Sequence, residues 1–312
     1  MDDNVRALIV TAKHYNLFTD LSSFNLLKTY LAFTFHAQNN DGTMHNFMSY
    51  QRDFLDSVAA DDVLGRTLWA CGYVYGGLSL PKGVREVARV IFEQAAQHAT
   101  SSLSLRGMSY SLLGFYHSRA AIRNAQERIK ALSAEILHHY ENVRAPDWEW
   151  FEDIMSYSNA RLPQAMLLAY DAVGDPPLLS CGEKTLGFLW DEVVTSKGAI
   201  NVIGNDGWYV RGLHRAIGDE QAIDVGALVE ALLDAYRITG KVQYYKNARK
   251  CFSWFTGNNL LNSPIYDETT GGCFDGLSLR EGVNQNLGAE STLAYLLCRL
   301  ALEEVEKPHS SG

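Results

Sequence analysis

Apolar residues recur at three- and four-residue spacing through nearly the whole chain, in segments that come in pairs. Within a pair the connection is short, whereas the connection to the next pair is long. This alternation predicts an all-α fold with about eleven or twelve helices, an estimate that rests on the spacing of the apolar residues. The expected helices lie near 5–14, 22–35, 61–76, 81–91, 102–116, 118–140, 163–174, 181–195, 225–238, 242–255 and 288–300.

The long connections lie near residues 38–60, 141–160, 197–220 and 257–287, and each combines acidic with aromatic residues. They recur with a period of about 50 residues and without a sequence repeat. A closed double ring of helices, with the long loops at one mouth, explains their shared composition. A helical bundle or an open solenoid is the competing architecture. The glycine-rich segment 197–212 alternates apolar residues, which suggests short strands or an extended loop. No linker-like stretch divides the chain, so residues 1–312 are expected to form a single domain.

The stretch Trp148–Pro163 is the most informative of the loops. Trp148 and Trp150 surround Glu149 and precede Glu152, in a segment too polar for a core helix and too aromatic for a solvated loop. Sugar sites need aromatic faces for the C–H face of a pyranose and directed hydrogen bonds for its hydroxyls. The alternative is a buried loop whose tryptophans and arginine only pack and cap.

Cleavage of a glycosidic bond needs a protonated acid and a second carboxylate that acts as base or nucleophile. Glu152 (or Glu149) is the expected general acid, because apolar neighbours raise a carboxyl pKa. Its expected partner is Asp62, Asp206 or Glu290. Asp61 is expected to cap a helix, as acids before helices usually do. The expected stacking surfaces are Trp148, Trp150, Trp208 and Tyr209, and the expected polar or substrate-binding residues are His45, Arg66, Tyr157, Asn159, Arg161, Gln221, Asp275, Asn284 and Asn286.

Several of these motifs together resemble a known family. They are HNFM at 45–48, the acid pair before Gly65-Arg66, WEWFED with YSNARLPQA, NDGWYVRG, and GVNQNLGAEST. The chain looks like a bacterial family of six-hairpin, (α/α)6-barrel glycosidase-like proteins, over nearly its whole length. Members are often described as glycosyltransferases because some are fused to one. The resemblance implies the toroid fold, a carbohydrate-facing mouth and a glycosyltransferase as partner. The usual Ser-Glu-Asp is Ala60-Asp61-Asp62 here, so a catalytic role for Asp61 is in doubt while Asp62 keeps its place.

Two other function classes compete with a glycosidase. A sugar epimerase or isomerase would need a base pair centred on histidine, and His45 is the only histidine well inside a long loop, with His214 at the border of another. A non-catalytic glycan-binding partner of a glycosyltransferase would keep the aromatic residues and need none of the acids. A lyase would need more basic residues than Arg66, Arg161 and Arg211 provide.

Charge, cysteine and histidine spacing, and glycine patterns argue against several classes of partner and cofactor. A net charge of −9 without a basic run argues against nucleic acid, and the substrate expected is an oligosaccharide or glycan. Five scattered cysteines and dispersed histidines predict neither disulfides nor a metal site, and no nucleotide-binding glycine pattern implies a cofactor. No signal peptide or membrane span is expected, so a cytoplasmic protein is the default expectation.

Overall fold

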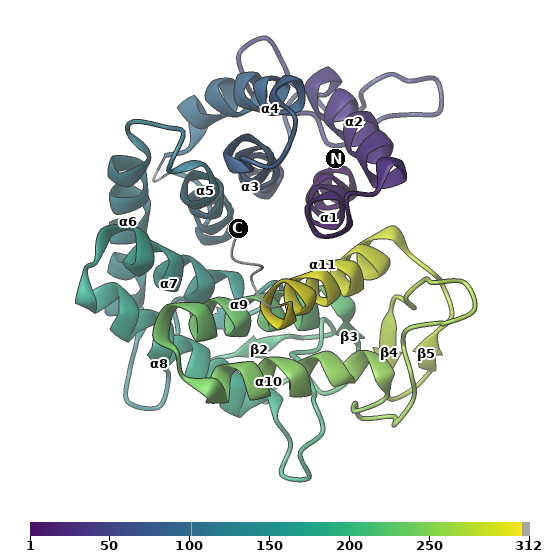
Figure 1. Ribbon diagram of the computed structural model, residues 1–312. Coiled ribbons are helices and arrows are strands. Elements are labelled where there is room, and N and C mark those ends of the chain that lie inside the picture. Colours follow the sequence, from purple (N-terminus) through teal and green to yellow (C-terminus); the bar gives the residue numbers. More distant parts are fainter. Residues whose placement is uncertain (101, 308–312) are drawn as a thin grey trace. The chain divides into compact units, whose positions relative to one another are not determined.

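The computed structural model describes residues 1–100 and 102–307. Within these residues it contains eleven α-helices and five very short strands (Figure 1). The helices are α1 (Asp2–Phe18), α2 (Leu21–His36), α3 (Asp61–Gly76), α4 (Lys82–Ala95), α5 (Leu105–Ser118), α6 (Ala125–Val143), α7 (Arg161–Val173), α8 (Pro176–Val193), α9 (Ala222–Thr239), α10 (Val242–Phe252) and α11 (Ala289–Glu306). The strands are β1 (Ile154–Met155), β2 (Tyr209–Val210), β3 (Glu220–Gln221), β4 (Gly276–Ser278) and β5 (Gly282–Asn284).

A helix forms at every place where the apolar spacing predicts one, but several boundaries differ. Helix α8 begins at Pro176, five residues before the predicted start, because proline is tolerated in a first helical turn. The sequence offers Asp20, Ser22 or Ser23 as the cap of α2. Asp20 takes this role, since its carboxylate accepts a hydrogen bond from the Ser23 amide at 2.7 Å. The sequence offers Ser101 or Ser102 as the cap of α5. The cap in the structure is Ser104, and Ser101 lies outside the described residues.

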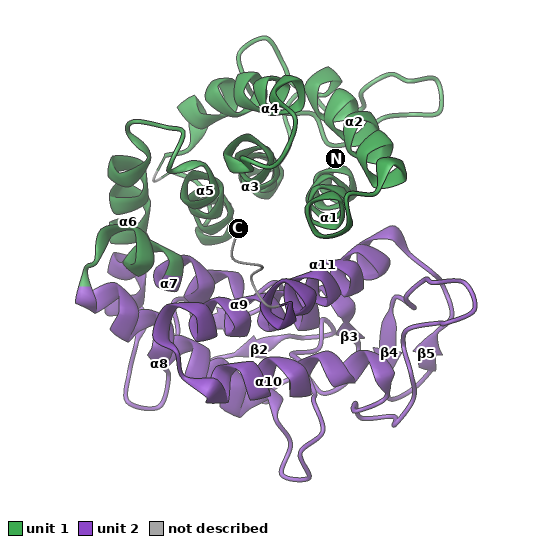
Figure 2. Cartoon of the chain, in the orientation of Figure 1, with its two compact units in different colours: residues 1–136, 168–175 green, residues 137–167, 176–312 purple. Residues whose placement is uncertain are grey.

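The chain forms two compact units, coloured separately in Figure 2. Unit 1 comprises Met1–Ile136 and Leu168–Asp175, and unit 2 comprises Leu137–Leu167 and Pro176–Gly312. Helix α7 therefore contributes its first half to unit 2 and its second half to unit 1.

Unit 1 is built from helices with two different burial patterns. Every residue is buried from Val63 to Gly72 in α3 and from Leu105 to Tyr116 in α5, whereas α2 and α4 bury one face each. Helices that are apolar all round belong in a core, and amphipathic helices cover it. Helix α3 accordingly packs against α1, α4 and α5.

Helices α3 and α5 approach each other backbone to backbone through glycines spaced seven residues apart. A Cβ atom would lie 2.6 Å from the Gly107 carbonyl oxygen if placed on Gly65, and 2.3 Å from that of Gly114 if placed on Gly72. Contacts this short leave no room for any side chain. The pairing also holds the first turns of α3 and α5 next to each other.

Unit 2 joins three long loops through its strands. Strand β1 pairs with β2 in antiparallel register, with Met155 opposite Tyr209. Strand β4 lies between β3 and β5 in a second antiparallel sheet. The segments predicted near 141–160, 197–220 and 257–287 are thus connected by backbone hydrogen bonds, above a core in which α9 packs on α10 and α11. Among the described helices, none combines the length and hydropathy needed to span a membrane.

Candidate active site

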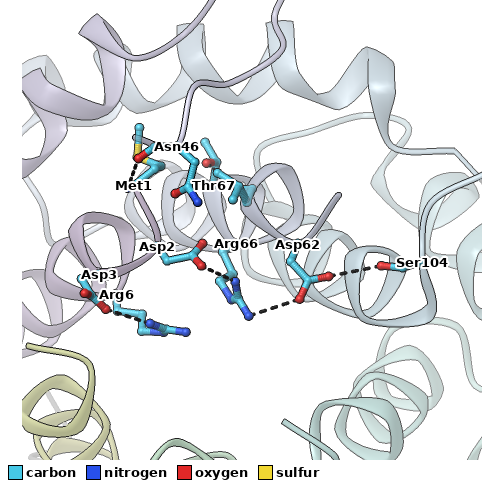
Figure 3. Close-up of polar contacts among 10 residues, drawn as sticks. Met1, Asp2, Asp3, Arg6, Asn46, Asp62, Arg66, Thr67 and Ser104 are labelled. Carbon is cyan, nitrogen blue, oxygen red and sulfur yellow. Dashed lines mark hydrogen bonds and ion pairs between the residues drawn. The ribbon is translucent and has the colours of Figure 1, made fainter. Parts of the chain in front are cut away.

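A buried guanidinium joins two carboxylates at the start of helices α1 and α3 in unit 1 (Figure 3). Arg66 Nη1 lies 2.8 Å from Asp2 Oδ2, and Arg66 Nη2 lies 3.2 Å from Asp62 Oδ2. The Arg66 side chain is 5% exposed, whereas those of Asp2 and Asp62 are 32% and 13% exposed. The two acids therefore remain partly accessible while the cation between them is covered.

The cluster keeps Arg66 charged. Burial alone would lower the pKa of its guanidinium, but Tyr110, Asp2 and Asp62 together raise it above the usual value. The Arg66 guanidinium also lies 4.9 Å from the centre of the Tyr110 ring. A buried arginine paired in this way stays cationic over the whole range in which proteins are stable. Two carboxylates at neutral pH thus share one permanent positive charge.

The adjacent acid, Asp61, has a structural role. Its Oδ2 accepts a hydrogen bond from the Ser104 amide at 2.8 Å, so it caps the neighbouring helix α5 and not its own helix. The Ser104 hydroxyl donates to Asp62 Oδ1 at 3.2 Å (Figure 3). The same hydroxyl accepts a hydrogen bond from the Gly107 amide. Asp61 fixes the position of α5, and Asp62 faces Arg66.

Sequence reasoning missed Asp2. The sequence did contain a pattern that marks Asp2. Two aspartates begin α1, as two begin α3, and an arginine follows four residues after Asp2 as it does after Asp62. In α1, however, Arg6 pairs with Asp3 at 2.9 Å, and Asp2 reaches across to α3.

The His45 side chain contacts other residues of the loop between α2 and α3. Its Nδ1 donates to the Asp56 carbonyl oxygen at 2.5 Å, and its ring stacks on Phe54 with centroids 4.1 Å apart. The Asp56 carboxylate accepts hydrogen bonds from the amides of Asn46 and Phe47. These contacts explain His45 as the residue that orders the loop between α2 and α3.

The aromatic stretch in unit 2 is more buried than its composition suggests. Trp148 and Trp150 are 2% and 0% exposed, and Trp148 packs against Phe188 and Tyr209 with ring centroids 5.5 and 5.0 Å apart. Little of either ring surface is exposed in this position, and the stacking role expected of the two tryptophans stays a prediction. Glu152 is half-buried in the same loop, and its carbonyl oxygen accepts the Trp148 indole hydrogen bond at 2.7 Å.

Arg161 lies in a buried polar network between α7 and α9. Its Nη2 lies 2.6 Å from Glu230 Oε2, its Nη1 donates to Gln164 at 2.6 Å, and Gln164 donates to Asp234 at 2.7 Å. Asn159 is also buried and donates to the Ser156 carbonyl oxygen. The structure places both residues in the packing of unit 2, and the substrate contact expected of them stays a prediction. Tyr157 beside them is half-buried.

The other residues predicted in unit 2 are distributed over its connected loops. Asp206 and Trp208 are exposed, Tyr209 is half-buried in β2, and Gln221 is half-buried in β3. Asn284 is exposed at the end of β5, and Glu290 is half-buried in the first turn of α11. Asp275 accepts hydrogen bonds from Asn286 and, at 3.0 Å, from Ser291, so both Asp275 and Asn286 organise the start of α11.

A further acid, Glu220, was passed over as a site residue although it lies in a predicted segment. It is 1% exposed and accepts hydrogen bonds from Asn201, Val202 and Trp254. Its position directly before α9 gave it the sequence signature of an ordinary helix-start acid.

Among proteins of known structure, this chain is similar to enzymes that process carbohydrates. Cellobiose 2-epimerase from Bacillus thermoamylovorans has a TM-score of 0.74 and 10% identity, covering 98% of this chain and 87% of the epimerase. A D-mannose isomerase has a TM-score of 0.70 and 13% identity, over 97% and 86%. An inactive variant of an α-1,6-mannanase from Salegentibacter, in complex with α-1,6-mannotetrose, has a TM-score of 0.66 and 13% identity, over 98% and 89%.

These similarities extend over nearly the whole chain and show its fold, the all-α (α/α)6 barrel that those enzymes share. The expected fold class is confirmed. No protein-family model and no curated protein matches the sequence.

Proposed function

We propose that this chain is a carbohydrate-active enzyme that cleaves a glycosidic bond with carboxylate chemistry. The observation that supports it best is the pair of partly exposed carboxylates, Asp2 and Asp62, on the buried Arg66 guanidinium. Hydrolases are among the solved proteins with this fold. One of them is inactive as a variant with two consecutive aspartates replaced by alanine. This chain also carries consecutive aspartates, Asp61-Asp62, at a helix start.

The ion pair with Arg66 suits Asp62 to the role of the ionised carboxylate in glycosidic bond cleavage and not to that of the general acid. An ionised carboxylate beside a fixed cation can act as base, nucleophile or electrostatic stabiliser, whereas the leaving oxygen needs a protonated acid. We assign Asp62 the first role and retain Glu152 as the proposed general acid. Asp206 and Glu290 are the remaining proposed partners, and each is tested by its own amide variant.

A sugar epimerase or isomerase is the second candidate, because proteins with these activities also share the fold. Proton abstraction from a carbon acid at neutral pH is most often the work of histidine. His45 is committed to the Asp56 carbonyl oxygen and to Phe54, and His214 lies exposed in the loop after β2. These placements favour the carboxylate chemistry.

The deciding experiment incubates the full chain with α-1,6-mannotetraose and with cellobiose in D2O, with and without phosphate, and follows products by NMR. Hydrolysis creates new reducing ends, and the first anomer formed distinguishes inversion from retention. Epimerisation leaves the number of reducing ends unchanged and incorporates deuterium next to the carbonyl carbon. Binding without either change would support a glycan-binding module and overturn the enzyme proposal.

The role of Asp62 is tested by Asp62→Asn against Asp53→Asn, which alters an exposed acid in the loop between α2 and α3. Loss of the base or nucleophile should lower kcat by about 100-fold or more while the variant stays folded. If both variants turn over glycan at the wild-type rate, the assignment of Asp62 is wrong.

A further inference from the structure

The loop that carries Trp208 is closed at its base by two glycines. A Cβ atom on Gly204 would lie 1.9 Å from the Gly218 carbonyl oxygen, and the Asn205 amide donates to the Asp219 carbonyl oxygen at 3.1 Å. Compact loops whose ends meet in this way are frequently functional. The segment from Gly204 to Asp219 is therefore a compact loop of unit 2 whose two ends are in contact. It is called the Trp208 loop below.

Trp208 has an unusual backbone conformation within this loop. Its φ angle is +53°, a region that bulky residues avoid. Its amide donates to the Gly204 carbonyl oxygen at 3.1 Å, and its carbonyl oxygen accepts from the Ala216 amide at 2.8 Å. The side chain is nevertheless 36% exposed. A strained backbone that presents an exposed aromatic side chain is typical of a binding site.

Glu220 lies buried directly after the base of the loop. Its Oε1 accepts a hydrogen bond from Asn201 Nδ2 at 2.9 Å. Its Oε2 accepts from the Val202 amide at 3.1 Å and from Trp254 Nε1 at 2.8 Å. All three partners are donors, so the ionised carboxylate is the form that satisfies them.

Arg215 connects the loop to this buried carboxylate. Its Nη1 donates to Asn201 Oδ1 at 2.5 Å, and its Nη2 donates to the Asn201 carbonyl oxygen. Asn201 thus accepts from an arginine inside the loop and donates to Glu220 beneath it. The sequence of contacts Arg215–Asn201–Glu220 fastens the loop to the interior of unit 2.

We propose that Glu220 is a positioning residue that, through Asn201 and Arg215, holds the Trp208 loop as a preformed platform on which a pyranose ring of an oligosaccharide stacks. The platform rests on the proposed carbohydrate function, whereas the fastening of the loop does not. Pre-organisation strengthens binding because less freedom is lost when the sugar binds. An indole face also suits the C–H face of a neutral sugar, which needs no charge on the protein.

A proton on Glu220 would undo this arrangement. A protonated carboxyl must donate from one oxygen, yet every atom that contacts it is a donor. The Asn201 amide would have to turn its oxygen toward Glu220, and this is the oxygen that accepts from Arg215. Burial raises the pKa of Glu220 to about 7, against the opposing effects of its three hydrogen bonds and of Arg215. Titratable groups nearby include Asp219 at the base of the loop and the buried thiol of Cys251 in α10. Glu192 of α8 and Tyr209 of β2 act on Arg215. With the carboxyl still buried, a proton on it is expected to release the loop without unfolding unit 2, so the loop is fastened above neutral pH and looser below it.

Amide hydrogen exchange tests the fastening without any ligand. Above neutral pH, Glu220→Gln should speed exchange of the Asn205, Trp208 and Ala216 amides by at least about tenfold and leave α9 unchanged. In wild type the same amides should lose protection, relative to an unstructured peptide, between about pH 8 and about pH 6. Arg215→Gln breaks the contact from the loop side and should remove this pH dependence even if Glu220→Gln folds poorly. Unchanged exchange in both variants would overturn the positioning role.

Binding of α-1,6-mannotetraose and of cellotetraose, followed by tryptophan fluorescence and calorimetry on the full chain, tests the platform. Trp208→Ala and Glu220→Gln should each weaken the binding of one probe by about tenfold or more, the range of a lost aromatic contact. Phe35→Ala, which removes an exposed ring on α2, is the control and should bind normally. If wild type turns over a glycan and Trp208→Ala binds it with unchanged affinity, Trp208 is not a stacking platform, and the proposed function still holds. No binding or turnover of any glycan by wild type overturns the proposed function together with the platform, and hydrogen exchange then still decides the role of Glu220.

Discussion

Gly72 on α3 lies so close to Gly114 on α5 that a Cβ atom on Gly72 would sit 2.3 Å from the Gly114 carbonyl oxygen. The opposing atom is backbone, so it cannot move aside as a side-chain end can. The contact therefore fixes how far apart the two helices are, and with it the separation of the first turns that carry Asp62 and Ser104.

Replacement of Gly72 by alanine should lower the free energy of unfolding by about 1–3 kcal/mol or more, because overpacking forces the helices apart. Gly187→Ala in α8 is the matched control, since no atom lies within 4 Å of a Cβ there. That change should be neutral or stabilising by up to about 1 kcal/mol, as expected for glycine to alanine inside a helix. Urea unfolding of the two variants measures the difference, and equal midpoints would contradict the close contact.

Loss of Arg161 should be far more harmful than loss of a surface arginine. Arg161→Met leaves Glu230 buried without its cation, which should destabilise by about 3–5 kcal/mol. The comparison variant, Arg144→Met, removes an arginine whose pair with Glu141 is 40% and 50% exposed, and its loss of stability should be much smaller. Thermal or chemical unfolding of both variants gives the measurement. Similar stabilities would show that the buried pair contributes little.

Glu220 should make stability depend on pH in a direction opposite to that of most carboxylates. Its pKa is about 7 in the folded chain against an ordinary value of 4.5, so between these values the folded state holds a proton that the unfolded state has lost. Stability should be highest below the lower value and fall as pH rises through about 7, by up to roughly 3 kcal/mol. Glu220→Gln should remove this component from unfolding curves measured across the window. An unchanged pH slope in the variant would refute the assignment.

Asp275 and Gly288 should show strong coupling. A Cβ atom on Gly288 would lie 2.0 Å from Asp275 Oδ1, because the carboxylate reaches over the start of α11 to Ser291. Gly288→Ala should therefore destabilise wild type by about 1–3 kcal/mol and cost much less in an Asp275→Ala background. A double-mutant cycle of unfolding free energies measures the coupling. Additive effects would mean that Asp275 does not occupy this space.

Helical periodicity was sufficient to predict an all-α fold, because apolar residues recur at helical spacing in every helix. The closed (α/α)6 toroid was implied by the resemblance of the motifs to a known family and not by periodicity. Composition could suggest which loops are polar and aromatic, but not which of their side chains are covered. Trp148 and Arg161 show the difference, because the composition of their segment predicts a pocket although both side chains are buried. Trp148 packs against Phe188, and Arg161 pairs with Glu230, and both partners lie far along the chain. Asp2 and Glu220 were missed for the converse reason, since their partners Arg66 and Asn201 are supplied by other segments. Asp62, Asp206, Glu152 and Glu290 stay predictions until their amide variants are measured.

Because α7 is divided between the two units, the polypeptide cannot be split into two fragments that each contain one whole unit. No single break in the polypeptide yields a fragment that contains all of one unit and none of the other, because residues 168–175 return to unit 1 after the chain has entered unit 2. A truncated product that ends before α7 lacks the last helical turns of unit 1, including Asp171, whose carboxylate accepts the Tyr116 hydroxyl at 2.6 Å. Expression of either half alone should therefore give aggregated or protease-sensitive material. Co-expressed halves should associate into folded protein only when the break lies outside the two divided helices, residues 125–143 and 161–173.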